Sequence, residues 1–189
     1  PAPGEMQKTI AFGSEIVEVM NNRYGSAMAM STEIGGSPNK VWLSGFWQSL
    51  DDYQSFLESY MADQQLMAAI SMSTSFMTEM QDQIGEVLRP PGERKAFAQV
   101  HRGRLKSTGV AEGTELILDL TNHVSELSGS ECGLVRPVTG DQYGVTFVAH
   151  ADTLQGLKDM TDTWVADEKY QELFAKGPEY FESEFDVTY

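Results

Sequence analysis

Apolar side chains recur with the period of an amphipathic helix in two separate stretches of the chain, residues 6–23 and 112–127. A glycine follows each stretch closely, which is typical of a helix end. An alternating pattern comes next in both places, at residues 26–34 and 130–138, and it predicts a strand with one apolar face. The residues that share this face are Met28, Met30, Thr32 and Ile34 in the first strand and Cys132, Leu134, Arg136 and Val138 in the second.

Each alternating strand leads through a turn that contains glycine into a second strand. The turn at residues 35–39 precedes a strand at 40–47, and the turn at 139–141 precedes a strand at 142–151. Turn residues between two strand-like segments predict a β-hairpin in each half of the chain.

A helix with an N-terminal capping residue follows each hairpin. Ser49 and Thr153 stand where a side-chain oxygen can accept hydrogen bonds from the free backbone N–H groups of a first helical turn. An Ala-Asp pair then interrupts each helix, and Asp63 and Asp167 are placed to cap a continuation. We expect the continuation helices at about residues 64–80 and 168–180, and a last strand after each, at 84–89 and 181–189.

The chain aligns with itself at an offset of 104 residues without a gap, and the same order of elements recurs in the two aligned segments. Residues 9–70 align with residues 113–174, and the identities fall at turns and caps, where chain geometry is demanding. We interpret the two segments as copies of one repeat. The identical pairs are Gly25 with Gly129, Ser26 with Ser130, Gly36 with Gly140, Val41 with Val145, Leu50 with Leu154, and Ala62-Asp63 with Ala166-Asp167.

One further strand, at residues 95–106, precedes the second copy and gives it the order β-α-β-β-α-β. This is the split βαβ arrangement, in which an antiparallel sheet carries both helices on one face. The other face of each sheet retains apolar side chains, so we expect the two sheets to pack face to face within one chain, as an α+β barrel. The sequence therefore predicts an α+β fold of tandem ferredoxin-like repeats, residues 1–92 and 93–189, the first of which lacks its opening strand.

Charge and cysteine content exclude several classes of partner. The 189 residues include 28 acidic and 13 basic side chains, and the formal net charge of −15 repels nucleic acid backbones and anionic membrane surfaces. The single cysteine, Cys132, forms no internal disulfide, and no histidine or cysteine spacing fits a metal site. No stretch is apolar enough to span a membrane, and the first residues have no signal-peptide pattern. We therefore expect a cytoplasmic protein that binds no nucleic acid, membrane or metal.

The strand at residues 95–106 is basic, although the protein as a whole is acidic. Its residue His101 lies across the pleat from Arg102 and Arg104 and has no second histidine at ligand spacing, which makes it a weak candidate for chemistry. We expect the basic side chains to form cross-strand ion pairs with acidic residues of the last strand. The basic residues are Arg102, Arg104 and Lys106, and the acidic ones are Glu182, Glu184 and Asp186.

Two pieces of the sequence resemble a known family. One is the hairpin with Gly36 or Gly140 after a strand, and the other is Ala166-Asp167-Glu168-Lys169-Tyr170, an Ala-Asp-x-x-Tyr helix break that residues 62–66 match in part. Both resemble the dimeric α+β barrel proteins with ferredoxin-like halves, which include antibiotic-biosynthesis-type monooxygenases. The resemblance implies this fold, and it implies oxygenation in which the substrate itself reacts with oxygen, so that no cofactor is needed. It also implies pairing of halves, through the two repeats of one chain or through a homodimer.

Differences between the two copies point to candidate catalytic residues in the second. His123 and His150 stand where the first copy has apolar residues, and imidazole titrates close enough to neutrality to accept a proton. Arg136 replaces Thr32 and is suited to stabilise an enolate-like anion. Each also admits a structural role, as a hydrogen-bonded histidine or as one half of an internal salt bridge. The residues expected to line the pocket beside them are Leu120, Leu134, Trp164 and Tyr170.

Three functions are open at this point. The first is a small-molecule-binding protein that acts as a cofactor-independent monooxygenase on an apolar or aromatic compound. The second is a non-catalytic module for assembly or stress-related binding, and the third is a haem-binding protein that uses His123. A cavity between helices and sheet with His123 or His150 pointing into it favours the enzyme, whereas a filled space favours the assembly module.

Overall fold

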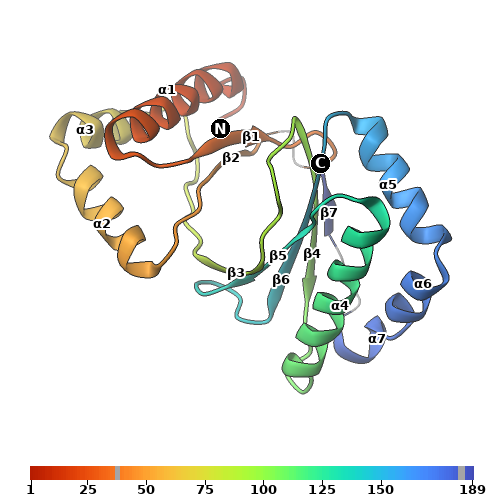
Figure 1. Cartoon of the computed structure of the whole chain (residues 1–189). Helices are drawn as coiled ribbons and strands as arrows, with labels where there is room; N and C mark the ends of the chain where they lie inside the picture. The colour runs from red at the N-terminus through yellow and green to blue at the C-terminus, as the bar shows by residue number, and fades with distance from the viewer. Residues whose placement is uncertain (37–38, 183–185) are drawn as a thin grey trace. The chain divides into compact units, whose positions relative to one another are not determined.

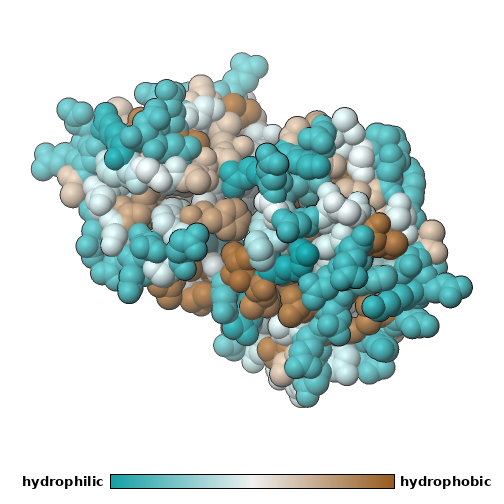
Figure 2. All heavy atoms as spheres, in the orientation of Figure 1, coloured by the Kyte–Doolittle hydropathy of each residue, from teal (hydrophilic) through white to brown (hydrophobic). Residues whose placement is uncertain are grey.

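The computed structural model describes residues 1–36, 39–182 and 186–189 and divides into two compact units, Pro1–Gln81 and Asp82–Tyr189 (Figure 1). Each unit has its own hydrophobic interior. Hydrophilic side chains cover much of the face that Figure 2 shows. No helix among the described residues is both long and apolar enough to cross a membrane.

The first unit is a two-stranded antiparallel sheet with helices packed on it. Its long helix contacts both strands and the helix that follows the hairpin. The buried core of this unit consists of Ile16, Met20, Phe56 and Leu66. The elements are α1 (Met6–Tyr24), β1 (Ala29–Thr32), β2 (Val41–Ser44), α2 (Leu50–Met61) and α3 (Gln64–Ser73).

The second unit is a five-stranded antiparallel sheet in the order β3-β5-β6-β4-β7. Figure 1 shows its helices together on one side of this sheet, where α5 packs on β4 and β6 and α4 packs on β5. The elements are β3 (Gly85–Arg89), β4 (Phe97–Arg104), α4 (Val110–Ser128), β5 (Gly133–Pro137), β6 (Gly144–Ala151), α5 (Leu154–Ala166), α6 (Glu168–Ala175), α7 (Gly177–Tyr180) and β7 (Asp186–Thr188).

The predicted α+β class and the antiparallel sheets are confirmed. Four strands of the second unit lie in the order β5-β6-β4-β7, which is the order of a split β-α-β-β-α-β unit with both crossovers on one face. The fifth strand, β3, comes from the segment that the sequence analysis assigned to the first repeat. It pairs with β5, and the compact units divide after Gln81. The boundary between the repeats after residue 92 stays a prediction.

The helix caps predicted from the sequence are confirmed. Ser49 accepts a hydrogen bond from the N–H of Asp52, and Thr153 accepts one from the N–H of Gly156. Asp63 and Asp167 cap α3 and α6 in the same way, by accepting backbone N–H groups of the first turn. These bonds satisfy groups that a helix start otherwise leaves free.

The continuation helix of the first unit is shorter than the predicted span 64–80, because α3 ends at Ser73. There the hydroxyls of Ser73, Thr74 and Ser75 bond to backbone carbonyls three residues earlier, at 2.6, 2.8 and 2.9 Å. Such local bonds compete with the regular helix, and they explain why the apolar pattern extends beyond the helix end.

Both units present a helix, a hairpin and a helix broken at aspartate, in the order that the internal offset predicts. That the units are copies of one repeat, and that their sheets pack face to face, stay predictions. The turn residues Ser37 and Pro38 and part of the last strand, including Glu184, lie outside the described residues. Arg104 does form the expected ion pair with Glu182, and it forms a second with Asp141.

Candidate functional site

The interior between the helices and the sheet of the second unit is apolar and aromatic. Its buried residues are joined by partly buried neighbours from α4, β6, α5 and α6, and we name the whole group the Trp164 cluster. Three of the four residues predicted to line a pocket belong to it: Leu120, Trp164 and Tyr170. The fourth, Leu134, is fully buried on β5 opposite Phe147. The cluster consists of Val124, Cys132, Ala149 and Trp164 with Leu120, Leu127, Phe147, Met160 and Tyr170.

Trp164 carries an unsatisfied polar group in this interior. The side chain is 3% exposed, and its Nε1 is buried without a hydrogen-bond partner among the described residues. The indole packs edge-on against Phe147, with ring centroids 5.7 Å apart. A buried N–H without an acceptor costs about 1–3 kcal/mol, so a ligand oxygen at this position would gain more than it would in water.

His123 projects from α4 toward the junction of α5 and α6. Its Nε2 lies 2.6 Å from Oδ1 of Asp167, which also accepts the N–H of Tyr170 at 2.8 Å. The hydrogen bond from His123 is the largest cause that lowers the pKa of the Asp167 carboxyl. These contacts match the structural role that the sequence left open for His123. They also occupy Nε2, one of the two ring nitrogens through which a histidine binds a haem iron.

The first unit holds its helix junction in the same way with different residues. Asp63 accepts hydrogen bonds from Arg23 at 2.8 Å and from the Tyr24 hydroxyl at 2.9 Å, while it caps α3. In the first unit, side chains at the end of α1 bond the aspartate that caps α3. In the second unit, His123 of α4 bonds the aspartate that caps α6, so both units have this contact at the helix junction.

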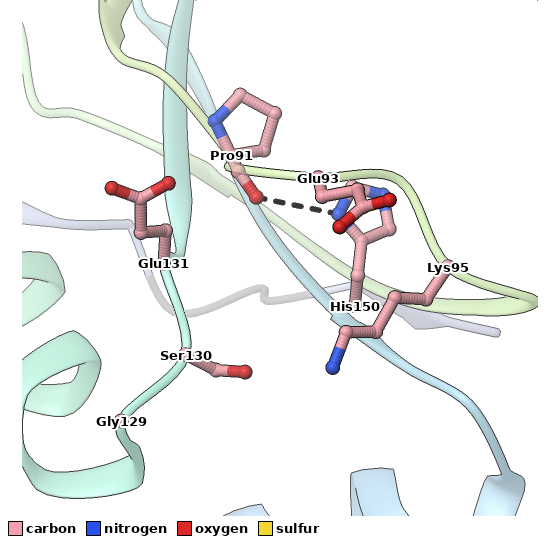
Figure 3. A pocket seen from close by; sticks show the side chains of 7 residues that line it. All are labelled: Pro91, Glu93, Lys95, Gly129, Ser130, Glu131 and His150. Atoms are coloured by element: carbon pink, nitrogen blue, oxygen red, sulfur yellow. Dashed lines mark hydrogen bonds between the residues drawn. The ribbon is translucent and has the colours of Figure 1, made fainter.

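His150 lines a small pocket on β6 (Figure 3). The pocket has a volume of about 180 Å³, which is below the range of about 300–1,000 Å³ that is usual for ligand sites. The Nδ1 of His150 lies 3.4 Å from the carbonyl oxygen of Pro91, as the dashed line in Figure 3 marks. Burial lowers the pKa of His150, and the charges of Arg94 and Lys95 lower it further. The pocket is lined by Pro91, Glu93, Lys95, Gly129, Ser130, Glu131 and His150.

Arg136 has an anionic partner within the chain. Its Nη2 lies 2.5 Å from Oε2 of Glu86, the residue directly opposite on β3. The two side chains are 41% and 51% exposed, so this is a surface ion pair of modest energy. The structure therefore gives His123, His150 and Arg136 three different partners and does not bring them together around one site.

His101, the histidine that the sequence analysis ranked lowest, lies in the same interior as the Trp164 cluster. Its ring packs edge-on against Phe147 with centroids 5.5 Å apart, and its Nε2 lies 2.5 Å from the amide of Gln99. Burial lowers the pKa of His101. The signal in the sequence was the i, i+2 spacing of Gln99 and His101, which places two polar residues on the helix-bearing face of β4.

Cys132, which the sequence places on the apolar face of a strand, is a buried core residue. It is 0% exposed, and burial is the main cause that raises the pKa of its thiol. Among the described residues, no group of three or more histidine, cysteine or acidic side chains is arranged to hold a metal ion.

We expect the second unit to lose stability as the pH falls from about 7.5 to about 5.5. The pKa values of His101 and His150 are lower in the folded state than in the unfolded chain, so the unfolded chain binds more protons in this range and stability rises with pH. Urea unfolding at a series of pH values measures the slope. A His101→Gln/His150→Gln variant should show a flatter profile, and an unchanged slope would contradict the assignment.

No model of a known protein family matches the sequence. No curated protein matches it either.

Three solved structures share the fold. The putative monooxygenase from Lactobacillus acidophilus NCFM is 8% identical with a TM-score of 0.71 over 99% of this chain and 87% of its own. A putative monooxygenase from Fusobacterium nucleatum subsp. nucleatum ATCC 25586 is 8% identical with a TM-score of 0.63 over 96% and 84%. An anthrone oxidase-like protein is 13% identical with a TM-score of 0.65 over 99% and 84%. At these identities the likeness shows the fold alone.

Proposed function

We propose that this protein binds a small apolar or aromatic compound and oxidises it as a cofactor-independent monooxygenase. The main support is the buried Nε1 of Trp164, a hydrogen-bond donor without an acceptor inside an aromatic interior. A phenol or ketone oxygen on a flat apolar molecule would satisfy this donor. The Trp164 cluster is packed and is not the pocket that His150 lines, so the cluster would have to open to admit the ligand. The shared fold with proteins described as monooxygenases and anthrone oxidase-like supports the same class of reaction.

The reaction suited to such a site is the oxidation of an activated methylene group to a carbonyl. The methylene loses a proton, and the electron pair delocalises onto the substrate oxygen that Trp164 holds. Molecular oxygen then accepts the electrons and adds to the carbon. Loss of the second hydrogen breaks the O–O bond, so that one oxygen atom becomes the carbonyl and the other leaves as water.

Within this site His123 lies at the junction of α5 and α6, where Asp167 fixes its ring. It would orient Tyr170, whose N–H bonds the same carboxylate and whose own pKa is raised by burial. Arg136 and His150 lie outside the Trp164 cluster and are bound to Glu86 and the Pro91 carbonyl.

Anthrone is the probe that tests this function. Metal-free protein in ¹⁸O₂ should form anthraquinone faster than buffer alone, with one ¹⁸O atom in the new carbonyl. Trp164→Phe keeps the ring but removes the N–H, and it should lower kcat on the order of 10²-fold.

The matched control is Trp42→Phe in the first unit, because the Nε1 of Trp42 already bonds Glu33 at 2.9 Å. This variant should keep the wild-type rate. Binding of anthrone without oxidation, measured by native mass spectrometry, would overturn the catalytic function and leave a binding module. Neither binding nor oxidation would overturn the proposal as a whole.

A further inference from the structure

Helices α4, α5 and α6 form the helix side of the Trp164 cluster, and α6 is the least anchored of the three (Figure 1). Both α4 and α5 rest on the sheet, and each has buried side chains. The short helix α6 packs against α4 and α5, has no buried residue, and contributes Tyr170 to the cluster. Because α6 buries little apolar surface, it can separate from the cluster at a lower free-energy cost than its neighbours.

The corresponding helix of the first unit is better anchored. Helix α3 also follows an aspartate cap, but Leu66 and Ser73 of this helix are buried. At the internal offset of 104 residues, Tyr170 takes the place of Leu66 and is only partly buried. Its ring stacks on Phe174 of the same helix, with 5.6 Å between the centroids, and Phe174 is itself exposed. The second unit therefore lacks the buried leucine that holds α3 in place.

A break in the helix bounds α6 at each end. Asp167, between α5 and α6, has an extended backbone with φ −85° and ψ 131°. Lys176 separates α6 from α7, and α7 is fixed by Lys106, which follows β4. The N–H of Lys106 bonds the Tyr180 carbonyl at 2.7 Å, and its ammonium group bonds the Pro178 carbonyl at 2.6 Å. The segment that can turn between two anchored helices is thus α6 alone.

A hydrogen bond holds the start of α6 to α4. The Nε2 of His123 lies 2.6 Å from Oδ1 of Asp167. The two side chains are 14% and 27% exposed, so water weakens this contact less than it weakens an ion pair on the open surface. The N–H of Asp167 bonds the Trp164 carbonyl at 3.1 Å, which places the contact within one helical turn of Trp164. This is the tryptophan whose buried Nε1 has no partner among the described residues.

We propose that α6 is a lid over the Trp164 cluster and that the hydrogen bond between His123 and Asp167 holds it closed. When this bond breaks, α6 turns about Asp167 and moves Tyr170 out of the cluster, which opens a space beside the indole. In the open state Nε1 of Trp164 bonds to water, whereas in the closed state it has no acceptor, so the unsatisfied donor favours opening. The occupant is a flat apolar or aromatic compound with an oxygen for Nε1, and this choice of ligand rests on the function proposed above.

Hydrogen exchange at the Trp164 indole tests the lid without any ligand. This proton exchanges only when water reaches it, so its rate measures how often the interior opens. In uniformly ¹⁵N-labelled full-length protein, with the signal assigned by Trp164→Phe, the indole and the backbone N–H groups of α6 should exchange with a small urea dependence. The backbone N–H groups of β6 should exchange more slowly and with the large urea dependence of global unfolding, because more surface is then exposed. A Trp164 indole with the urea dependence of β6 would overturn the lid.

Two variants test the bond that holds the lid closed. His123→Leu removes the donor, and Asp167→Asn keeps an oxygen that caps α6 but weakens the bond to His123. Each should raise the exchange rate of the Trp164 indole about tenfold or more, at the same small urea dependence. Asn122→Ala is the matched control, because Asn122 is the neighbouring residue of α4 and bonds Arg89 of β3 at 2.9 Å. It should leave the rate within about twofold, and an unchanged rate in both test variants would overturn the role of His123.

Anthrone distinguishes the lid from the proposed function. Under anaerobic conditions, its association rate in stopped-flow fluorescence should rise about tenfold in His123→Leu, because a larger fraction of the molecules is open. Exchange that follows these expectations in protein that binds no anthrone would support the lid and overturn the proposed function. Anthrone binding at the wild-type rate in His123→Leu, with indole exchange that follows global unfolding, would overturn the lid and leave the proposed function in place.

Discussion

Replacement of Leu134 by alanine is expected to lower the free energy of unfolding of the second unit by about 2–5 kcal/mol. Leu134 is 0% exposed on β5, a strand with β3 on one side and β6 on the other. Its side chain stands opposite Phe147, which itself packs on Trp164. Truncation removes the transfer free energy of the lost carbons and leaves a cavity that paired strands on both sides cannot close.

Val138→Ala is the matched control, because Val138 continues the same face of the chain but is 55% exposed. It should change the free energy of unfolding by less than about 0.5 kcal/mol. Urea unfolding followed by methyl NMR signals of the second unit separates this transition from that of the first. A loss below about 1 kcal/mol for Leu134→Ala would contradict the picture of a rigid, fully packed strand.

The helices and their starts were predictable from the sequence because the forces that set them are local. Hydrophobic period and cap side chain act within a few residues, so Ser49, Thr153, Asp63 and Asp167 could be assigned before any tertiary contact was known. The end of α3 was missed because serine and threonine hydroxyls stop that helix while the apolar pattern continues.

Strand partners were less predictable because pairing depends on distant parts of the chain. The pattern at residues 84–89 predicts a strand, and β3 is there. The residues of this segment do not indicate which strand it pairs with. Its neighbour is β5, which lies more than forty residues further along the chain, in the other predicted repeat. The partner of Arg136 was unpredictable for the same reason. Its charge indicates an anionic partner, but only the pairing of β3 with β5 places Glu86 opposite it.

The candidate site shows what comparison of the two halves could and could not find. Trp164 and Tyr170 follow from the helix break at Asp167, whose position the alignment supplied. His101 received little weight as a candidate because the arginines of its strand dominate the local pattern. The chemistry of a buried histidine depends on the groups that surround it in the folded chain. Gln99, Thr161 and Phe147 come from three different elements, and only the folded chain places them around one ring.

The second large effect is expected from Gly133→Ala at the start of β5. A Cβ at this position would lie 2.6 Å from the Cβ, 2.8 Å from the Cα and 3.0 Å from the nitrogen of Pro91. Two of these atoms are backbone, and the proline ring prevents the connection between β3 and β4 from yielding by a side-chain rotation. The free energy of unfolding should therefore fall by about 1–3 kcal/mol, the usual cost of overpacking.

Gly177→Ala is the control, since a Cβ there meets no atom within 4 Å and the residue starts α7. It should leave stability unchanged or raise it by up to about 1 kcal/mol, because alanine restricts the unfolded chain more than glycine does. The same measurement has a second readout at the pocket, where the carbonyl of Pro91 faces Nδ1 of His150 at 3.4 Å. A displaced Pro91 would shift the imidazole NMR signals of His150 in Gly133→Ala and leave those of His101 in place. Wild-type stability with unshifted His150 signals would mean that the segment from Pro91 to β4 moves freely, and that the pocket beside it has no fixed shape.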